Sequence, residues 1–122
     1  MPGASGENEG MSTGETQPDA PEIDIDSFAA VRAQGASVLD VRELDEYADA
    51  HIPGVIHIPL GQLGQRLHDL PADRPLYVVC ASGGRSLMAA TALQNQAGIE
   101  AVSVAGGTKG WMAAGREVDT GA

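Results

Sequence analysis

The sequence predicts an α/β fold, with a mainly parallel central sheet and helices on both faces. From Ile23 onward, short apolar runs rich in β-branched residues alternate with stretches of helical periodicity. Strands that alternate with helices require crossover connections, which make neighbouring strands parallel and place the helices against the sheet. The chain has 122 residues, 43% of them apolar, which is enough for one domain with a single core.

The first half of the folded part predicts two helices and two strands. Asp26 or Ser27 caps a short helix that carries Phe28 and Val31 on one face, and Gly35 ends this helix. The predicted elements that follow are a buried strand over residues 36–41, a helix over 43–50 with Leu44 and Tyr47 on one face, and a strand over 55–58.

The second half continues the alternation. Leu63, Leu67 and Leu70 form the apolar stripe of a further helix, and a strand over residues 75–79 leads directly into Cys80. The remaining predicted elements are an Ala-rich helix from about Arg85 to Ala97 closed by Gly98, a strand over 101–104, and a short helix that carries Trp111 and Met112.

Composition and charge exclude several classes of partner. The net charge is −10 and Lys109 is the only lysine, so the surface offers little positive charge to nucleic acid or to an anionic membrane. No apolar run approaches a membrane span, and the N-terminus has neither the basic start nor the apolar stretch of a signal peptide. The single cysteine cannot form an internal disulfide. We therefore expect a cytoplasmic domain without nucleic-acid or membrane partners.

Residues 1–20 are predicted to be a disordered acidic leader, and residues 21–122 to be the folded domain. Every charged side chain before Arg32 is acidic, and the leader otherwise consists mostly of small or polar residues with little surface to bury. We interpret the leader as a solubilising extension, with an interaction tail as the alternative.

The strand, loop and helix around Cys80 carry the predicted chemistry. Ligands of open parallel sheets bind at the carboxyl ends of the strands, where Cys80 lies. The free N–H groups and the dipole of the helix that begins near Arg85 favour a thiolate, as does the charge of Arg85. Gly83 and Gly84 let the N–H groups of the loop converge on one point. These features predict a nucleophilic Cys80 with a depressed pKa, although a lone cysteine after a strand is more often a small buried hydrophobe.

Three segments resemble the rhodanese family, the sulfurtransferases that carry a persulfide on a loop cysteine. The segments are V-V-C-A-S-G-G-R-S-L-M-A-A around Cys80, L-D-V-R-E-L-D-E-Y-A-D-A-H-I-P-G-V-I-H-I-P-L over residues 39–60, and V-A-G-G-T-K-G-W over residues 104–111. They stand in the order found in the family, and the resemblance extends from about residue 23 to 118. It implies the rhodanese-like fold, with a parallel sheet of five strands flanked by helices, in a single-domain member.

The resemblance implies that Cys80 carries the sulfur and that the loop after it binds the donor. The implied binding residues are Ala81, Ser82, Gly83, Gly84, Arg85 and Ser86. The first five would supply a cradle of backbone N–H groups for the persulfide, the Arg85 side chain would hold an anionic donor, and Ser86 would fix the loop from the start of the helix. The implied supporting positions are Asp40 and Arg42 beside the loop, His51 in the turn before the next strand, and Gly106, Gly107 and Trp111 in a segment packed against the loop.

The activity implied by the resemblance is sulfur transfer in two half-reactions. A small donor such as thiosulfate or a persulfide, including a persulfide-bearing protein, would load Cys80, and cyanide or a thiol would remove the sulfur. No metal or organic cofactor is implied. Ala81 stands where relatives that prefer thiosulfate tend to carry a basic residue, so the sequence leaves the natural donor open.

Two other functions are the alternatives. Phosphatases and arsenate reductases of rhodanese-like type have five residues between the cysteine and the arginine of their loop. In this chain only four residues lie between Cys80 and Arg85. The shorter loop fits a single sulfur atom better than a phosphate group. Some rhodanese-like domains serve as regulatory or docking modules, but many of these lack the cysteine.

Other candidate sites are weaker. His51, His57 and His68 have no spacing that gathers them, so no metal site is expected. The segment A-G-G-T-K-G lacks the Ser or Thr that must follow Lys in a phosphate-binding loop. The Trp111 ring fits either stacking on a substrate or packing in the core.

Overall fold

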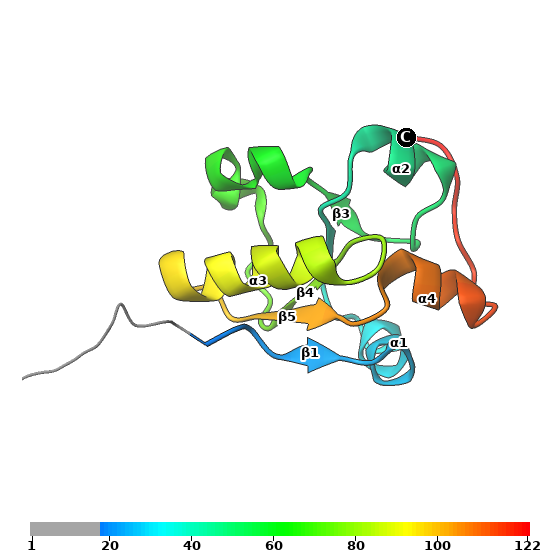
Figure 1. Cartoon of the computed structure of the whole chain (residues 1–122), viewed down its shortest axis with the longest axis horizontal. Coiled ribbons are helices and arrows are strands. Elements are labelled where there is room, and N and C mark those ends of the chain that lie inside the picture. Colours follow the sequence, from blue (N-terminus) through cyan, green and yellow to red (C-terminus); the bar gives the residue numbers. More distant parts are fainter. Residues whose placement is uncertain (1–17) are drawn as a thin grey trace, which may run out of the picture.

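The computed structural model describes residues 18–122, so residues 1–17 of the predicted leader lie outside the described part (Figure 1). In chain order the elements are β1 (Glu22–Ile23), α1 (Ile25–Ala33), β2 (Val38–Asp40), α2 (Leu44–Asp49), β3 (Ile56–His57), the 3₁₀ helices η1 (Leu60–Gln65) and η2 (Leu67–Asp69), β4 (Leu76–Val79), α3 (Gly84–Gln96), β5 (Ala101–Val104) and α4 (Gly107–Ala113). No helix in this part of the chain is long and apolar enough to cross a membrane.

The strands form one parallel sheet of five strands in the order β1-β5-β4-β2-β3, which confirms the predicted α/β fold. The chain leaves the neighbouring parallel strands β2 and β4 toward opposite edges of the sheet. After β2 it continues to β3 on one side, and after β4 it continues to β5 on the other. Such a switch point opens a crevice at the carboxyl ends of the two strands. The segments after β2 and β4 therefore meet at one place.

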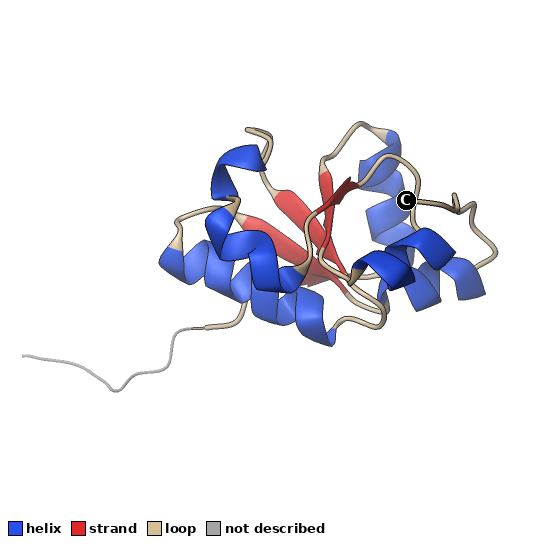
Figure 2. Cartoon of the chain, turned by 90° about the horizontal axis from the view of Figure 1, so that it is seen from above, coloured by secondary structure: helices blue, strands red, loops and turns tan. Residues whose placement is uncertain are grey.

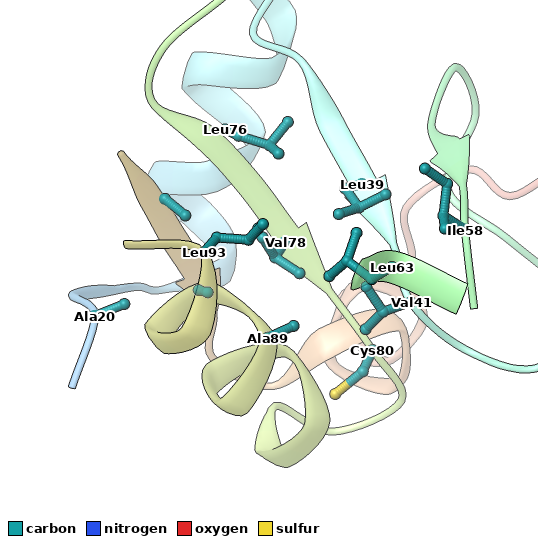
Figure 3. Packing of buried hydrophobic residues seen from close by; sticks show 12 residues of the cluster. Ala20, Leu39, Val41, Ile58, Leu63, Leu76, Val78, Cys80, Ala89 and Leu93 are labelled. Atoms are coloured by element: carbon teal, nitrogen blue, oxygen red, sulfur yellow. The ribbon is translucent and has the colours of Figure 1, made fainter. Parts of the chain in front are cut away.

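The sheet is buried on both faces, and Figure 2 shows helices on either side of the strands. Along β4, Leu76 and Val78 pack in a cluster with α3 and η1, whereas Tyr77 and Val79 pack in a second cluster with Phe28 of α1 and Trp111 of α4. This alternation is the period of two expected of a strand covered on both sides. Cys80 continues the first series, and Figure 3 shows it just past the end of β4.

The start of the domain differs from the prediction in two respects. The short strand β1 was not predicted, because two residues carry no periodicity; it forms by pairing with β5. The predicted caps of the first helix, Asp26 and Ser27, are wrong. Asp24 caps α1, since its Oδ1 accepts the N–H of Ser27 at 2.7 Å, so the helix begins two residues earlier. The packed chain also includes Ala20, which is 4% exposed and whose N–H donates to Oγ1 of Thr91 in α3.

The predicted helix with the Leu63, Leu67 and Leu70 stripe is wrong in type but correct in packing. The chain forms two 3₁₀ helices there, because Gly61 and Gly64 weaken a continuous α-helix. The three leucines still pack on the α3 side of the sheet. The predicted arrangement of side chains on α2 also differs from the structure.

The spacing of Leu44 and Tyr47 predicts that they share one face of α2, but Leu44 is 57% exposed. Tyr47 stacks on the rings of His51 and His57, whereas Leu44 faces solvent, so the spacing of the two residues does not mark a continuous apolar face. The predicted strands are otherwise confirmed, each shorter than expected at one or both ends, except β5, whose bounds match.

Candidate active site

Cys80 lies at the switch point, buried at the carboxyl end of β4 with 1% of its surface exposed. The loop that follows turns back so that the N–H of Gly83 donates to Sγ of Cys80 at 3.1 Å. Gly83 makes this turn with φ of 118°, a left-handed conformation that favours glycine, and caps α3. The sulfur is therefore held inside a short loop at the start of a helix.

Two buried serine hydroxyls extend this environment away from the sulfur. Ser86 Oγ lies 3.4 Å from Sγ of Cys80, donates to the Gly83 carbonyl at 3.1 Å, and lies 2.8 Å from Oγ of Ser103 on β5. The single hydrogen of the Ser86 hydroxyl is used in its bond to the Gly83 carbonyl, so in this arrangement the Ser86 oxygen accepts the hydrogen of Ser103. Ser86 can then turn its own hydrogen from the Gly83 carbonyl to a thiolate. No local sequence pattern points to Ser103.

The environment favours ionisation of Cys80. Burial is the largest single influence and opposes the thiolate, but the Ser86 hydroxyl and the backbone N–H groups of Ser86, Gly83 and Ser82 together outweigh it. The pKa of Cys80 therefore lies below the ordinary value of a thiol. This agrees in direction with the sequence prediction, and hydrogen bonds rather than burial are the cause.

The Cys80 thiol is expected to be alkylated at a pH where an ordinary cysteine is still protonated. Replacing Ser86 by alanine removes a donor to the thiolate, which should raise the midpoint of alkylation by about one to two pH units. Ser103→Ala should raise it by less, because Ser103 acts through Ser86. The measurement is the rate of iodoacetamide alkylation against pH, with Ser37→Ala as the control, since Ser37 bonds Asp73 at the surface. An unchanged midpoint in Ser86→Ala would contradict this assignment.

The first turn of α4 is locked onto the Cys80 loop. The N–H of Thr108 donates to the carbonyl of Cys80 at 2.8 Å, and the N–H of Lys109 donates to the carbonyl of Ala81 at 2.9 Å. Gly107 permits this approach, because it has φ of 59° and a Cβ there would meet the Cys80 carbonyl oxygen. The segment expected to pack beside the loop therefore does so through its backbone.

Asp40, the last residue of β2, and Arg42, which follows this strand, form a buried ion pair. Nε and Nη2 of Arg42 donate to the Asp40 carboxylate, the shortest bond being 2.9 Å. The Arg42 backbone N–H caps the same carboxylate, and Nη2 also donates to the carbonyl of Ala50 at the end of α2. The pair thus fixes the loop that leads into α2.

The Arg85 side chain forms an ion pair with Glu46, a residue that was not among the predicted site residues. Its guanidinium donates two bonds to the Glu46 carboxylate, at 2.7 and 2.8 Å. The hydrogen bond with Arg85 lowers the pKa of Glu46 to about 2, and the same bond raises the pKa of Arg85 above its ordinary value. Glu46 Oε1 also accepts the N–H of Glu43 at the start of α2. The predicted binding of an anionic donor by Arg85 would require this ion pair to open.

The remaining candidates have structural surroundings. The ring of Tyr47 is stacked between His51 and His57, at centroid distances of 3.8 and 4.2 Å, so the tyrosine ring separates the two imidazoles. Trp111 is 4% exposed and packs edge-on against Phe28, which favours the packing interpretation over stacking on a substrate. In residues 18–122 no group of three or more His, Cys, Asp or Glu side chains is arranged to hold a metal ion.

Comparison with known proteins identifies this arrangement. The model of the rhodanese-like domain matches residues 25–114, which include every element from α1 to α4. The chain belongs to the rhodanese-like domain family. A thiosulfate sulfurtransferase, GlpE, of Pseudomonas savastanoi is 36% identical to it over 84 residues, which cover 69% of this chain and 79% of GlpE.

A rhodanese-related protein of Thermoplasma volcanium has a similar structure, with a TM-score of 0.73 and 32% identity, over 81% of this chain and 97% of that one. A second kind of rhodanese relative is a transcriptional regulator, Rv0324, of Mycobacterium tuberculosis. It is 39% identical over 108 residues, which cover 84% of this chain but 47% of the regulator. The chain spans between 47% and 60% of the length of three of its curated relatives.

Proposed function

We propose that this rhodanese-like domain transfers a sulfane sulfur from a small donor to a thiophilic acceptor through a persulfide on Cys80. One observation carries the proposal: the only cysteine of the chain is held in a loop whose hydrogen bonds lower its pKa, at the switch point of the sheet. The sulfurtransferase named among the relatives supports the same chemistry.

The reaction proceeds in two steps. The Cys80 thiolate attacks the outer sulfur of thiosulfate or of a persulfide, the donor's S–S bond breaks, and sulfite or a thiolate leaves with the electron pair. The acceptor, cyanide or a thiolate, then attacks the outer sulfur of the Cys80 persulfide and releases the Cys80 thiolate. The Gly83 N–H and the Ser86 hydroxyl are placed to stabilise negative charge in both steps.

The other residues of the loop have supporting roles in this proposal. The backbone of Ala81, Ser82 and Gly84, together with the N–H of Arg85, completes the cradle for the outer sulfur. Asp40 and Arg42 hold the neighbouring loop in place through their buried ion pair. Trp111 stabilises the core under α4.

A phosphatase activity fits the geometry less well. A phosphate would need the positive charge of Arg85, which Glu46 neutralises through a two-bond ion pair. A regulatory or docking role is the second candidate, because a match to this chain forms part of a transcriptional regulator. Such a role does not require turnover.

The test is steady-state kinetics with thiosulfate and cyanide varied together, followed by glutathione persulfide as donor. Transfer through a Cys80 persulfide predicts parallel double-reciprocal lines, since the first product leaves before the acceptor binds. Hydrolysis of p-nitrophenyl phosphate without sulfur transfer would favour the phosphatase. No turnover with any donor would favour the docking module and overturn the proposal.

A further inference from the structure

A pocket of about 250 Å³ adjoins the Cys80 loop, and we call it the α2–α4 pocket. Residues from the β2 and β4 loops and from α2 and α4 line it, among them Arg42, Glu46, Asp49, Ala81, Thr108 and Lys109. Both helices lie on the same side of the molecule in Figure 1. The pocket wall is joined to the active-site loop, because the N–H groups of Thr108 and Lys109 donate to the carbonyls of Cys80 and Ala81.

The charges that line this pocket are balanced. Arg42 is neutralised by Asp40, and Glu46 by Arg85. Asp49 and Lys109 are exposed, and neither has an ion-pair partner within residues 18–122. One carboxylate and one ammonium without an ion-pair partner among these residues therefore line the pocket. A doubly charged inorganic anion in this pocket would be attracted by the Lys109 ammonium but repelled by the carboxylates of Glu46 and Asp49, so the pocket is poorly suited to such an anion.

A polar atom in the same wall has no partner. Oγ1 of Thr108 is buried and makes no hydrogen bond, the one such side-chain atom in the described part of the chain. Thr108 is 2% exposed and lines the pocket. Buried hydroxyls are nearly always paired, which indicates that a polar group of a bound molecule completes this wall.

We infer that the α2–α4 pocket binds the acceptor of the sulfur transfer, and that this acceptor is a small thiol carrying both an amine and a carboxylate. Its ammonium pairs with Asp49 and its carboxylate with Lys109, while its thiolate lies toward Ala81, which lines the pocket and directly follows Cys80 in the chain. The volume supports a molecule of this size, because one water occupies about 30 Å³ and cyanide would leave most of the pocket empty. The thiolate sulfur bonds to the outer sulfur, the Cys80 S–S bond breaks, and the Cys80 thiolate leaves. This inference rests on the proposed function.

The test uses four thiols on the persulfide form of the protein: L-cysteine, cysteamine, 3-mercaptopropionate and 2-mercaptoethanol. After correction for thiol pKa, L-cysteine should react about 1.5- to fivefold faster than either singly charged thiol, the range expected for one exposed ion pair. Lys109→Ala should remove the advantage over cysteamine, and Asp49→Asn the advantage over 3-mercaptopropionate, and neither should slow 2-mercaptoethanol. Asp45→Asn is the control, because Asp45 is exposed on α2 and does not line the pocket. Equal corrected rates for all four thiols would overturn the inference.

A binding measurement separates this inference from the proposed function. S-methyl-L-cysteine cannot accept sulfur, but it should slow the alkylation of Cys80 by iodoacetamide in the unmodified protein, and Lys109→Ala and Thr108→Val should weaken this protection. Protection without any persulfide formation would sink the proposed function and keep the binding site. Persulfide formation without protection would overturn only the binding site.

Discussion

Replacement of Cys80 by serine is expected to lower the rate of sulfur transfer by roughly three orders of magnitude or more, to the uncatalysed background. Serine keeps the size of the side chain and can still accept the N–H of Gly83, so the loop should keep its shape. Its hydroxyl has a far higher pKa than a thiol and cannot form a persulfide. The measurement is the initial rate of transfer from thiosulfate to cyanide.

Two controls make this result interpretable. The Cys80→Ser variant should unfold in urea within about 1 kcal/mol of the wild type, because the substitution conserves volume. The sequence contains no second cysteine that could replace Cys80 in the reaction. Transfer that persists in this variant would mean that the reaction bypasses Cys80, and the assignment of the nucleophile would be wrong.

Among the Gly→Ala substitutions possible within residues 18–122, Gly107→Ala is expected to have the largest effect on stability. The new Cβ would meet the carbonyl oxygen of Cys80 and lie 2.7 Å from the carbonyl carbon and oxygen of Ala81, all of them backbone atoms that cannot rotate away. Relief requires α4 to move off the loop, which breaks the bonds from Thr108 and Lys109. We expect the free energy of unfolding to fall by about 3 kcal/mol or more.

Gly115→Ala is the matched control for this substitution. Gly115 also has a positive φ, 76°, but a Cβ there meets nothing within 4 Å. Its cost should therefore be only the left-handed backbone strain, about 1–2 kcal/mol. Urea unfolding followed by the fluorescence of Trp111, the only tryptophan, measures both variants. Equal losses would show that the approach of α4 to the loop does not depend on Gly107.

The sequence predicts those parts of the site that one continuous segment supplies. The apolar run before Cys80, the glycines after it and the helix that starts near Arg85 are neighbours in the chain, so their arrangement follows from local rules for strands, turns and caps. The structure places the Gly83 N–H against the sulfur, as expected of loop N–H groups that converge on one point, whereas the position of the Ser86 hydroxyl beside the sulfur did not follow from these local rules. The alternation of strands and helices likewise predicts the parallel sheet.

Contacts between distant segments could not be predicted in this way. Glu46 looks like an ordinary acidic residue in the first turn of α2, and only the meeting of the β2 and β4 loops brings it to Arg85. Ser103 stands in an apolar strand, and it reaches Ser86 because the pairing of β5 with β4 turns it toward α3. Signals for both residues lie in the tertiary arrangement and not in the local pattern.

The central claim is that Cys80 carries a sulfur atom, and intact mass spectrometry tests it most directly. The reduced protein is incubated with thiosulfate or glutathione persulfide and weighed, with Cys80→Ser treated in parallel. We predict a gain of one sulfur atom that is absent from the variant and is lost on addition of cyanide or L-cysteine. Wild-type protein that gains no sulfur from either donor, or a variant that gains it equally, would contradict the account.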